Sequence, residues 1–337
     1  MTQNTTDTKD TGTMGKSGRT SRQARILLLA SGAMLTLSPR IMAQTADTPC
    51  VSNVTSSTQA CGNLSKGSSD DQSQSGTTTS AASTQNDWVD RWMRTVDRVR
   101  ASQPHFPAPL VTTHVILVEQ YRYDLAWQPD PVGGAVTSNY GASRGLEIIP
   151  TTRLEIGISP PPYVVHQSSL RDGFGDLSFQ LKYRALSAPE GQGDYFVGFF
   201  FGGSLPTGSA PNGLGHTMFF PTFAAAKGIG ALDIQSTIGA GLPATGTDLL
   251  GRTIVFNTAV DYRIRGIIWP MLEQNSTFWS GGPLDGKKQV FLTPGIVLGG
   301  FPLAERLHVS LAAGVQIAVT EFRQYNHRWI ASVRLPF

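Results

Sequence analysis

Apolar and polar residues alternate along most of the second half of the chain, and the last ten residues show this pattern clearly. Trp329, Ala331, Val333, Leu335 and Phe337 are apolar, whereas the residues between them are mostly polar. A period of two is typical of a β-strand with one apolar face and one polar face. A soluble β-sandwich could contain such a strand. A last strand that ends on an aromatic residue is also typical of an outer-membrane β-barrel.

The same alternation predicts twelve strands between residues 109 and 337. The predicted strands are 111–126, 139–149, 153–165, 174–186, 193–205, 216–226, 231–242, 252–263, 267–278, 288–299, 306–319 and 328–337. Short connections alternate with longer loops rich in Gly, Pro and Asn, as periplasmic turns and extracellular loops do. We therefore expect an all-β fold, an antiparallel transmembrane β-barrel of about twelve strands. Pro221, Pro270 and Pro294 fall within these strands, and each predicts a bulge or kink.

Composition narrows the classes of protein that the chain can belong to. Charged residues make up only 15% of the 337 residues, below the roughly 25% of ordinary soluble domains. After the N-terminal region no stretch approaches the length of apolar sequence that a membrane-spanning helix needs, so a membrane location would require a closed barrel. The net charge of +3 is too small to indicate nucleic acid as a partner.

Residues 1–43 have the pattern of a secretory signal peptide. A basic lead precedes the apolar run Ile26–Leu37, and the small residue Ala43 follows it. The alternative is a buried helix of a cytosolic domain. Residues 44–86 are rich in Ser, Thr and Gln and predict a disordered linker. The only two cysteines, Cys50 and Cys61, lie in this linker, and in an exported protein such a pair can close a small disulfide loop.

Residues 87–101 predict one amphipathic helix. Trp88, Trp92, Val96 and Val99 recur at helical spacing, and charged residues fill the other faces. Gln103-Pro104 ends the pattern. Two hypotheses remain open: the helix covers or plugs the periplasmic mouth of the barrel, or it docks a partner.

Strand alternation also predicts which polar side chains line the lumen. They are Gln120, Arg122, Glu155, Gln180, Lys182, Arg184, Asp233, Gln235, Asn257, Asp261, Arg263, Glu273, His308, Gln316 and Arg334. Charges of both signs are mixed, which predicts a narrow polar interior rather than a wide pore. Either these charges pair to make the wall rigid, or they line a route for a small solute.

The sequence offers little support for catalysis. His308 and Ser276 each lie in a plain alternating strand, and the chain has no Gly-x-Ser-x-Gly and no His-Glu-x-x-His motif. The histidines are scattered without the spacing of metal ligands. We expect no enzyme, no cofactor and no metal.

Several motifs are similar to those of a known family. Asp172–Arg184 resembles the Gly-x-Gly-Asp-x-x-x-x-x-Lys-Tyr-Arg signature of the outer-membrane proteins called "putative MetA-pathway of phenol degradation". Leu205-Pro206-Thr207-Gly208 resembles the family's Leu-Pro-Thr-Gly at the top of the next upward strand. Glu119-Gln120-Tyr121 and Arg153-Leu154-Glu155 resemble its first strand and a tight turn, and Glu273 lies where the family often has a Glu.

This resemblance implies a channel or transporter in the outer membrane of a Gram-negative-type bacterium, for small aromatic or hydrophobic solutes. The implied partners are outer-membrane lipid, a small-molecule solute, and the barrel-assembly machinery acting through the C-terminal strand that ends in Phe337. The alternative is a structural or assembly barrel without transport, and an outer-membrane hydrolase is a further one.

Overall fold

The structure is a computed structural model that describes residues 80–129, 135–142 and 144–337, with side chains from residue 87 onward. The predicted signal peptide at 1–43 and residues 44–79 of the predicted linker lie outside the described residues. The helices are α2 (Ser80–Ala101) and α3 (Thr247–Leu250). The strands are β1 (Gln120–Pro129), β2 (Val136–Gly141), β3 (Leu146–Thr151), β4 (Leu154–Ser159), β5 (Tyr163–His166), β6 (Gly173–Phe174), β7 (Leu177–Ala188), β8 (Tyr195–Leu205), β9 (Met218–Ile229), β10 (Leu232–Pro243), β11 (Arg252–Tyr262), β12 (Ile268–Ser280), β13 (Lys288–Pro302), β14 (His308–Ala318) and β15 (His327–Pro336).

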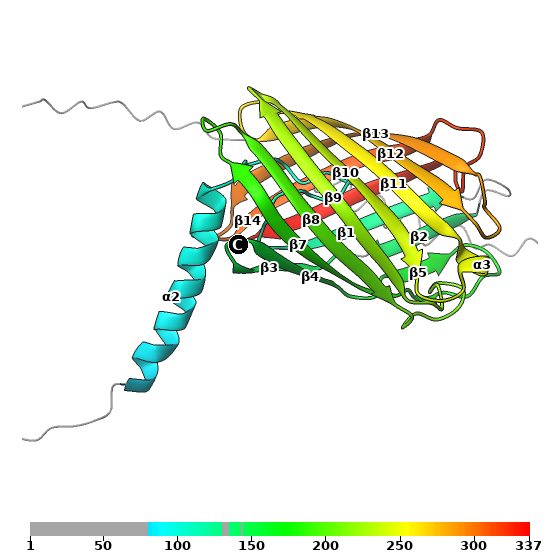
Figure 1. Cartoon of the computed structure of the whole chain (residues 1–337), viewed down its shortest axis with the longest axis horizontal. Coiled ribbons are helices and arrows are strands. Elements are labelled where there is room, and N and C mark those ends of the chain that lie inside the picture. The colour runs from blue at the N-terminus through cyan, green and yellow to red at the C-terminus, as the bar shows by residue number, and fades with distance from the viewer. Residues whose placement is uncertain (1–79, 130–134, 143) are drawn as a thin grey trace, which may run out of the picture. The chain divides into compact units, whose positions relative to one another are not determined.

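All the strands belong to one antiparallel sheet, which closes because β15 pairs with β1 (Figure 1). Three passes of the wall are interrupted, and each is made of two strands that follow one another in the chain. They are β2 and β3, β4 and β5, and β6 and β7. The wall therefore has twelve passes, which confirms the predicted closed twelve-stranded barrel. Pro160, Pro161 and Pro162 separate β4 from β5, since proline has no N–H to give to the ladder.

The outer surface of the wall is apolar, as a transmembrane barrel requires. Large apolar side chains are exposed all round it, among them Leu181, Phe199, Phe201, Ile238, Ile254, Phe256, Leu272, Leu292, Ile296 and Leu311. Exposed apolar surface on this scale indicates contact with lipid. The barrel thus has an apolar outer face and a polar inner face, the reverse of a soluble domain.

The two ends of the barrel differ in the length of their connections. At one end, the short-turn end, the connections are brief, such as Thr152-Arg153 and residues 230–231. This end also holds α2 and the C-terminus (Figure 1). At the other end, the long-loop end, lie the longer connections, such as residues 206–217 and the loop that contains α3.

The first predicted strand is wrong in its first half. Residues 111–126 were expected to form it, but β1 begins at Gln120. Residues 103–119, here called the inner segment, instead lie inside the barrel, where they bond to inward side chains of β1, β10, β12 and β15. Pro104, Pro107 and Pro109 explain the beginning of this detour, because they cannot supply successive donors to a sheet.

A bulge or a kink was predicted at Pro221, Pro270 and Pro294, and the bulge does not occur. The register of β12 with β13 runs unbroken past Pro270 and Pro294, and that of β8 with β9 runs unbroken past Pro221. A missing donor costs one hydrogen bond, whereas a register shift needs an extra residue in one strand. The shifts that do occur lie between Ile148 and Thr151, Arg184 and Leu186, and Leu298 and Phe301.

Helix α2 is longer than the predicted 87–101, since it begins at Ser80. Its last turn ends where the Ser102 amide and hydroxyl both donate to the Val99 carbonyl oxygen, at 3.1 and 3.0 Å. No helix in the described part of the chain is long and apolar enough to cross a membrane. The predicted stripe of α2 is partly realised in packing: Val96 and Val99 are fully buried.

Candidate functional site

The tip of the inner segment, residues 107–113, is held by one carboxylate. Glu273, fully buried on the inner face of β12, accepts hydrogen bonds from three successive backbone amides, those of Leu110 (2.6 Å), Val111 (3.1 and 3.2 Å) and Thr112 (2.6 Å). These amides have no strand to pair with, and a buried amide without an acceptor is costly. A charged acceptor makes these bonds stronger than backbone pairing would.

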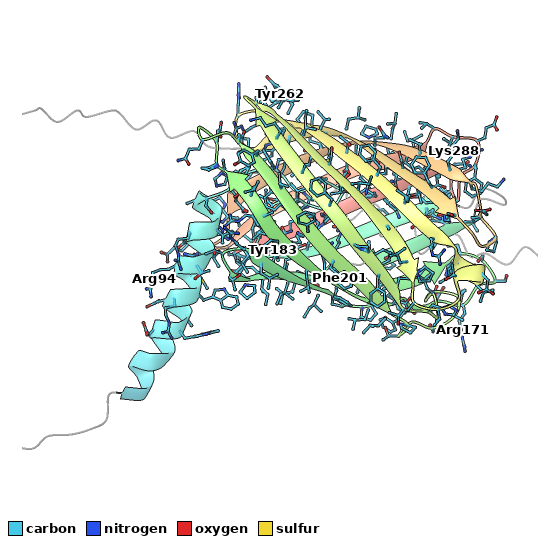
Figure 2. All side chains as sticks on the ribbon, viewed as in Figure 1. Arg94, Arg171, Tyr183, Phe201, Tyr262 and Lys288 are labelled. Atoms are coloured by element: carbon cyan, nitrogen blue, oxygen red, sulfur yellow. The ribbon has the colours of Figure 1, made fainter. Side chains whose placement is uncertain are left out.

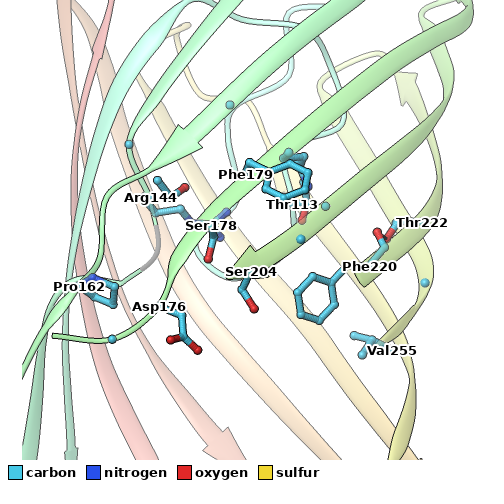
Figure 3. A pocket seen from close by; sticks show the side chains of 18 of the residues that line it. Thr113, Arg144, Pro162, Asp176, Ser178, Phe179, Ser204, Phe220, Thr222 and Val255 are labelled. Atoms are coloured by element: carbon cyan, nitrogen blue, oxygen red, sulfur yellow. Dashed lines mark hydrogen bonds between the residues drawn. The ribbon is translucent and has the colours of Figure 1, made fainter. Parts of the chain in front are cut away.

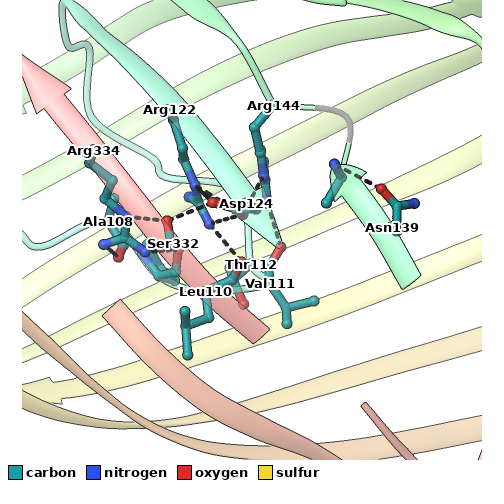
Figure 4. A network of polar contacts seen from close by, with 12 residues as sticks. Ala108, Leu110, Val111, Thr112, Arg122, Asp124, Asn139, Arg144, Ser332 and Arg334 are labelled. Carbon is teal, nitrogen blue, oxygen red and sulfur yellow. Dashed lines mark hydrogen bonds and ion pairs between the residues drawn. The ribbon is translucent and has the colours of Figure 1, made fainter. Parts of the chain in front are cut away.

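Arginines hold the carbonyl oxygens of the same tip (Figure 4). Arg334 of β15 donates to the carbonyl oxygens of Ala108 and Pro109, the latter at 3.0 Å. Arg122 of β1 donates to the Leu110 carbonyl oxygen at 2.7 Å. The tip is therefore bound on both its donor and its acceptor sides, by wall residues that are far apart in the sequence.

Asp124 balances this group of arginines. Its carboxylate accepts from Arg122 at 2.7 to 3.1 Å and from the Ser332 hydroxyl at 2.5 Å. It also pairs with Arg144 at 3.5 Å, and Arg144 donates to the Val111 carbonyl oxygen at 3.1 Å. Both oxygens of Asp124 are thus engaged, as a buried carboxylate requires.

The two arms of the inner segment are tied to each other and to the opposite wall. The Gln103 side chain donates to the Leu117 carbonyl oxygen (2.6 Å) and accepts from its amide (3.2 Å), so the segment folds back as a loop. Gln235 donates to the Pro107 carbonyl oxygen at 2.8 Å. Glu155 accepts from the amide of Val118 at 2.6 Å.

Apolar packing fills the lumen at the short-turn end. Phe106, Val115 and Leu117 of the inner segment pack against a buried cluster that includes Phe196 and Phe200 of β8. On the opposite wall, a Cβ added to Gly295 or Gly314 would come within 2.6 Å of the Leu110 side chain. These two glycines therefore form the recess that receives Leu110.

Beyond the tip, towards the long-loop end, the lumen widens into a cavity of about 530 Å³. Its wall mixes neutral polar side chains with glycines and apolar side chains, and Ser178, Gln180, Ser204 and Thr222 are among the polar lining residues (Figure 3). Phe220 of β9 also lines this cavity and is 37% exposed.

Two features distinguish the cavity wall from the packed part of the lumen at the short-turn end. The Ser204 hydroxyl is buried and has no hydrogen-bond partner among the described residues. Gly157, Gly202 and Gly239 also line the cavity, and the absence of side chains at these positions leaves room beside Phe220. The cavity thus presents an aromatic ring beside open space.

The charged groups that line this cavity are each paired with an opposite charge or bound by backbone amides. Glu147 lies 3.8 Å from Lys182 and accepts from Gln120 at 2.6 Å. Asp176 accepts from the loop amides of Gly208 and Leu214, at 2.9 and 2.8 Å. Arg144 is engaged by Asp124, as described above. Among these groups, Asp176 is the one without a charged partner, and the cationic Arg144 is paired.

The structure brings most of the predicted lumen residues together. Those that are buried inside the barrel are Gln120, Arg122, Glu155, Lys182, Arg184, Asp233, Gln235, Asp261, Glu273, Gln316 and Arg334. Lys182 lies 2.6 Å from Glu155. Gln180 and Asn257 line the cavity. The role of these residues in contacting a solute stays a prediction.

Two predicted lumen residues lie apart from this group. Arg263 lies in a short turn and bonds the exposed Glu190 at 2.7 and 2.9 Å, and this bond holds the pKa of Glu190 below its usual range. His308 contacts the carbonyl oxygen of Arg306 at 3.3 Å, near the short-turn end. Strand ends escape the alternation rule, because a side chain there can turn toward solvent.

Sequence reasoning missed several residues of the site. Asp124 and Phe220 follow the alternation of their strands and could have been found by extending it. Arg144 lies between β2 and β3, so no strand pattern could place it. In the described part of the chain, no group of three or more His, Cys, Asp or Glu could hold a metal ion.

Among solved structures, an outer membrane channel from Pseudomonas putida F1 is similar over 69% of this chain and 100% of that chain, with 14% identity and a TM-score of 0.47. The outer-membrane expressed OmpT of Vibrio cholerae is similar over 68% of this chain and 100% of its own, with 9% identity and a TM-score of 0.33. No curated protein matches the sequence. Residues 97–330 match the family described as "Putative MetA-pathway of phenol degradation", and the chain belongs to this family.

Proposed function

We propose that the protein is an outer-membrane channel for small, uncharged aromatic solutes. The closed barrel with its apolar outer face supports a membrane location, and the family name supports a link to aromatic compounds. By the usual orientation of such barrels, the long-loop end faces outward. Helix α2, the start of β1 and the end of β15 then lie on the periplasmic side. Outer-membrane lipid and the barrel-assembly machinery are then its partners, and it is not an enzyme.

The cavity is the observation that carries this proposal. Its volume of about 530 Å³ exceeds the roughly 150 Å³ that holds a benzene ring, so a one-ring solute fits together with water. Phe220 offers a ring to stack on, and neutral polar side chains such as Ser178 and Thr222 line the wall with it. Because Arg144 of the lining is already paired with Asp124, an anionic solute would be desolvated without compensation.

The inner segment gives the channel its constriction. Its tip lies between the cavity and the packed part of the lumen at the short-turn end, and Thr113 of this tip lines the cavity. A solute that leaves the cavity toward the periplasm must pass the tip. Transport would then depend on local movement of the tip rather than on a permanently open pore.

Solute binding tests this proposal directly. We expect catechol to bind the purified protein in isothermal titration calorimetry, and Phe220→Ala to weaken binding about ten-fold through loss of ring contact. Phe219→Ala is the matched control, since this neighbouring ring stacks on Phe201, which is exposed on the outer face. Benzoate, a charged ring of similar size, should bind at least about ten-fold more weakly than catechol. Equal affinity in Phe220→Ala and wild type, or equal binding of the two ligands, would refute the proposed solute class.

The second candidate is a structural or assembly barrel without transport. The apolar cluster that closes the short-turn end favours it, since Phe106 and Leu117 fill the lumen together with Phe196 and Phe200. The two functions differ in liposome swelling: a channel admits the solute, and a structural barrel does not. Catechol binding without any solute entry would support the structural alternative with a vestigial site.

A further inference from the structure

The apolar stripe of α2 changes from buried to exposed along the helix. Val96 and Val99 are fully buried against the mouth of the barrel. One turn earlier, Trp92 is partly buried, and its indole N–H donates to Glu119 at 2.7 Å. A further turn earlier, Trp88 is 58% exposed, with its ring 5.8 Å from that of Trp92. The stripe therefore continues past the part of the helix that the barrel covers.

The position of α2 explains this change. The helix crosses the short-turn end at β3 and extends beyond the wall (Figure 1). With 22 residues, it is about 33 Å long at 1.5 Å per residue. The barrel has no surface to offer Trp88 and Val89, and the latter is 40% exposed. Because residues four apart share a face of a helix, Trp88 faces the same side as the buried Val96.

The surface that continues from this face is the lipid-facing wall. Tyr183 and Tyr262 are exposed at the short-turn end, where aromatic residues of a barrel mark the membrane interface (Figure 2). Tyr183 pairs with Leu154, next to the turn that follows β3. The exposed part of α2 thus begins at the rim where the lipid-facing wall ends.

The polar face of α2 is suited to the same surface. Between residues 87 and 101 the helix carries four arginines and three aspartates. Arg94 points away from the barrel, on the side opposite the apolar stripe (Figure 2). An amphipathic helix with a Trp on one face and arginines on the other is typical of helices that lie in a membrane interface.

We propose that α2 lies on the periplasmic leaflet of the membrane, with Trp88 and Val89 inserted among the phospholipids beside the barrel wall. The occupant of the exposed stripe is the phospholipid surface itself. The proposal rests on the barrel lying in a membrane and is independent of which solute the lumen carries. It assigns to the helix a third role, beside covering the mouth and docking a protein partner.

Fluorescence quenching at single cysteines tests this proposal. The full chain carries Cys50→Ser and Cys61→Ser and is reconstituted into vesicles of phosphatidylethanolamine and phosphatidylglycerol. Bimane is attached at Trp88→Cys, at Arg94→Cys as the polar-face control, and at Phe201→Cys as the lipid-facing control. We expect doxyl-labelled lipid to quench position 88 within about two-fold of position 201, and aqueous iodide to quench position 94 most strongly.

The remaining outcomes overturn the proposal. If iodide quenches position 88 as strongly as position 94, the stripe faces water. If neither quencher reaches position 88, a protein surface covers it, either a second copy or a partner. Because none of the three variants changes a residue that lines the cavity, catechol binding in the same preparations shows separately whether the proposed solute site is present.

Discussion

Glu273→Gln should loosen the tip of the inner segment without unfolding the barrel. The substitution keeps the size of the side chain but removes its charge and one of its two acceptor oxygens. In the native protein those oxygens satisfy the amides of Leu110, Val111 and Thr112. In the variant, an amide NH₂ group faces donors that need an acceptor.

The size of the effect follows from the bonds that are lost. A hydrogen bond to a charged group contributes roughly 1.5–3 kcal/mol, and losing one leaves a buried donor unsatisfied. Since about 1.4 kcal/mol corresponds to a factor of ten, the open state of the tip should become about ten to a hundred times more populated. The rest of the segment should stay seated, because Gln103 still bonds Leu117 and Glu155 still accepts from the Val118 amide.

Hydrogen exchange with mass spectrometry measures this population. Amides in a peptide covering residues 108–118 should exchange about ten to a hundred times faster in Glu273→Gln than in wild type, whereas the strand amides should not change. Glu321→Gln is the control, since Glu321 is exposed in the loop between β14 and β15. Unchanged exchange at Leu110–Thr112 in Glu273→Gln would show that the carboxylate does not hold the tip.

Two further predictions concern the neighbours of the tip and the docking of α2. Gly295→Ala should displace the tip, because the added Cβ would lie 2.6 Å from Leu110. Adding Leu110→Ala in the same chain should restore the wild-type hydrogen exchange of the tip amides. If it does not, the contact with Leu110 is not the cause. The Arg306 hydrogen bond and charge hold the pKa of Asp97 below its ordinary value of 3.8. The pair, joined at 2.7 Å, therefore stabilises docking above that value, and its contribution is lost as the pH falls through the lowered pKa. Because both side chains are partly exposed, the change should be only about 0.5 kcal/mol, seen as increased mobility of a dye at Arg94→Cys and absent in Arg306→Gln.

The wall of the barrel could be predicted from the sequence because lipid and lumen impose opposite demands on alternate residues. Leu177–Ala188 shows this directly, since the buried Lys182 and Arg184 alternate with the exposed Leu181 and Tyr183. The interrupted passes were harder to place. Three consecutive prolines divide β4 from β5, yet the pass continues in the same direction beyond them.

The inner segment could not be predicted, and the reason is physical. Val111–Val118 is apolar enough to be a strand by composition. Its pattern of polar and apolar residues does not show which groups accept the hydrogen bonds of its backbone amides. Those acceptors are side chains such as Glu273 and Glu155, more than thirty residues away in the sequence. A strand and a segment that is bound by distant side chains can therefore have the same sequence pattern. Only the closed barrel shows which partners the segment has.

The way in which the inner segment is held decides how the lumen can open. Its base is fixed at both ends: Gln103 bonds Leu117 in both directions, and α2 and β1 adjoin it directly. Removing the whole segment would break these bonds, expose Phe106 and Leu117 to water, and pull α2 from the mouth of the barrel. Moving the tip alone breaks its bonds to Glu273, Gln235 and the arginines and takes Leu110 out of its recess, and the polar lumen can rehydrate the polar groups that are freed. Because this second movement leaves the base and its apolar packing in place, we propose residues 107–113 as the gate and the rest of the segment as its frame.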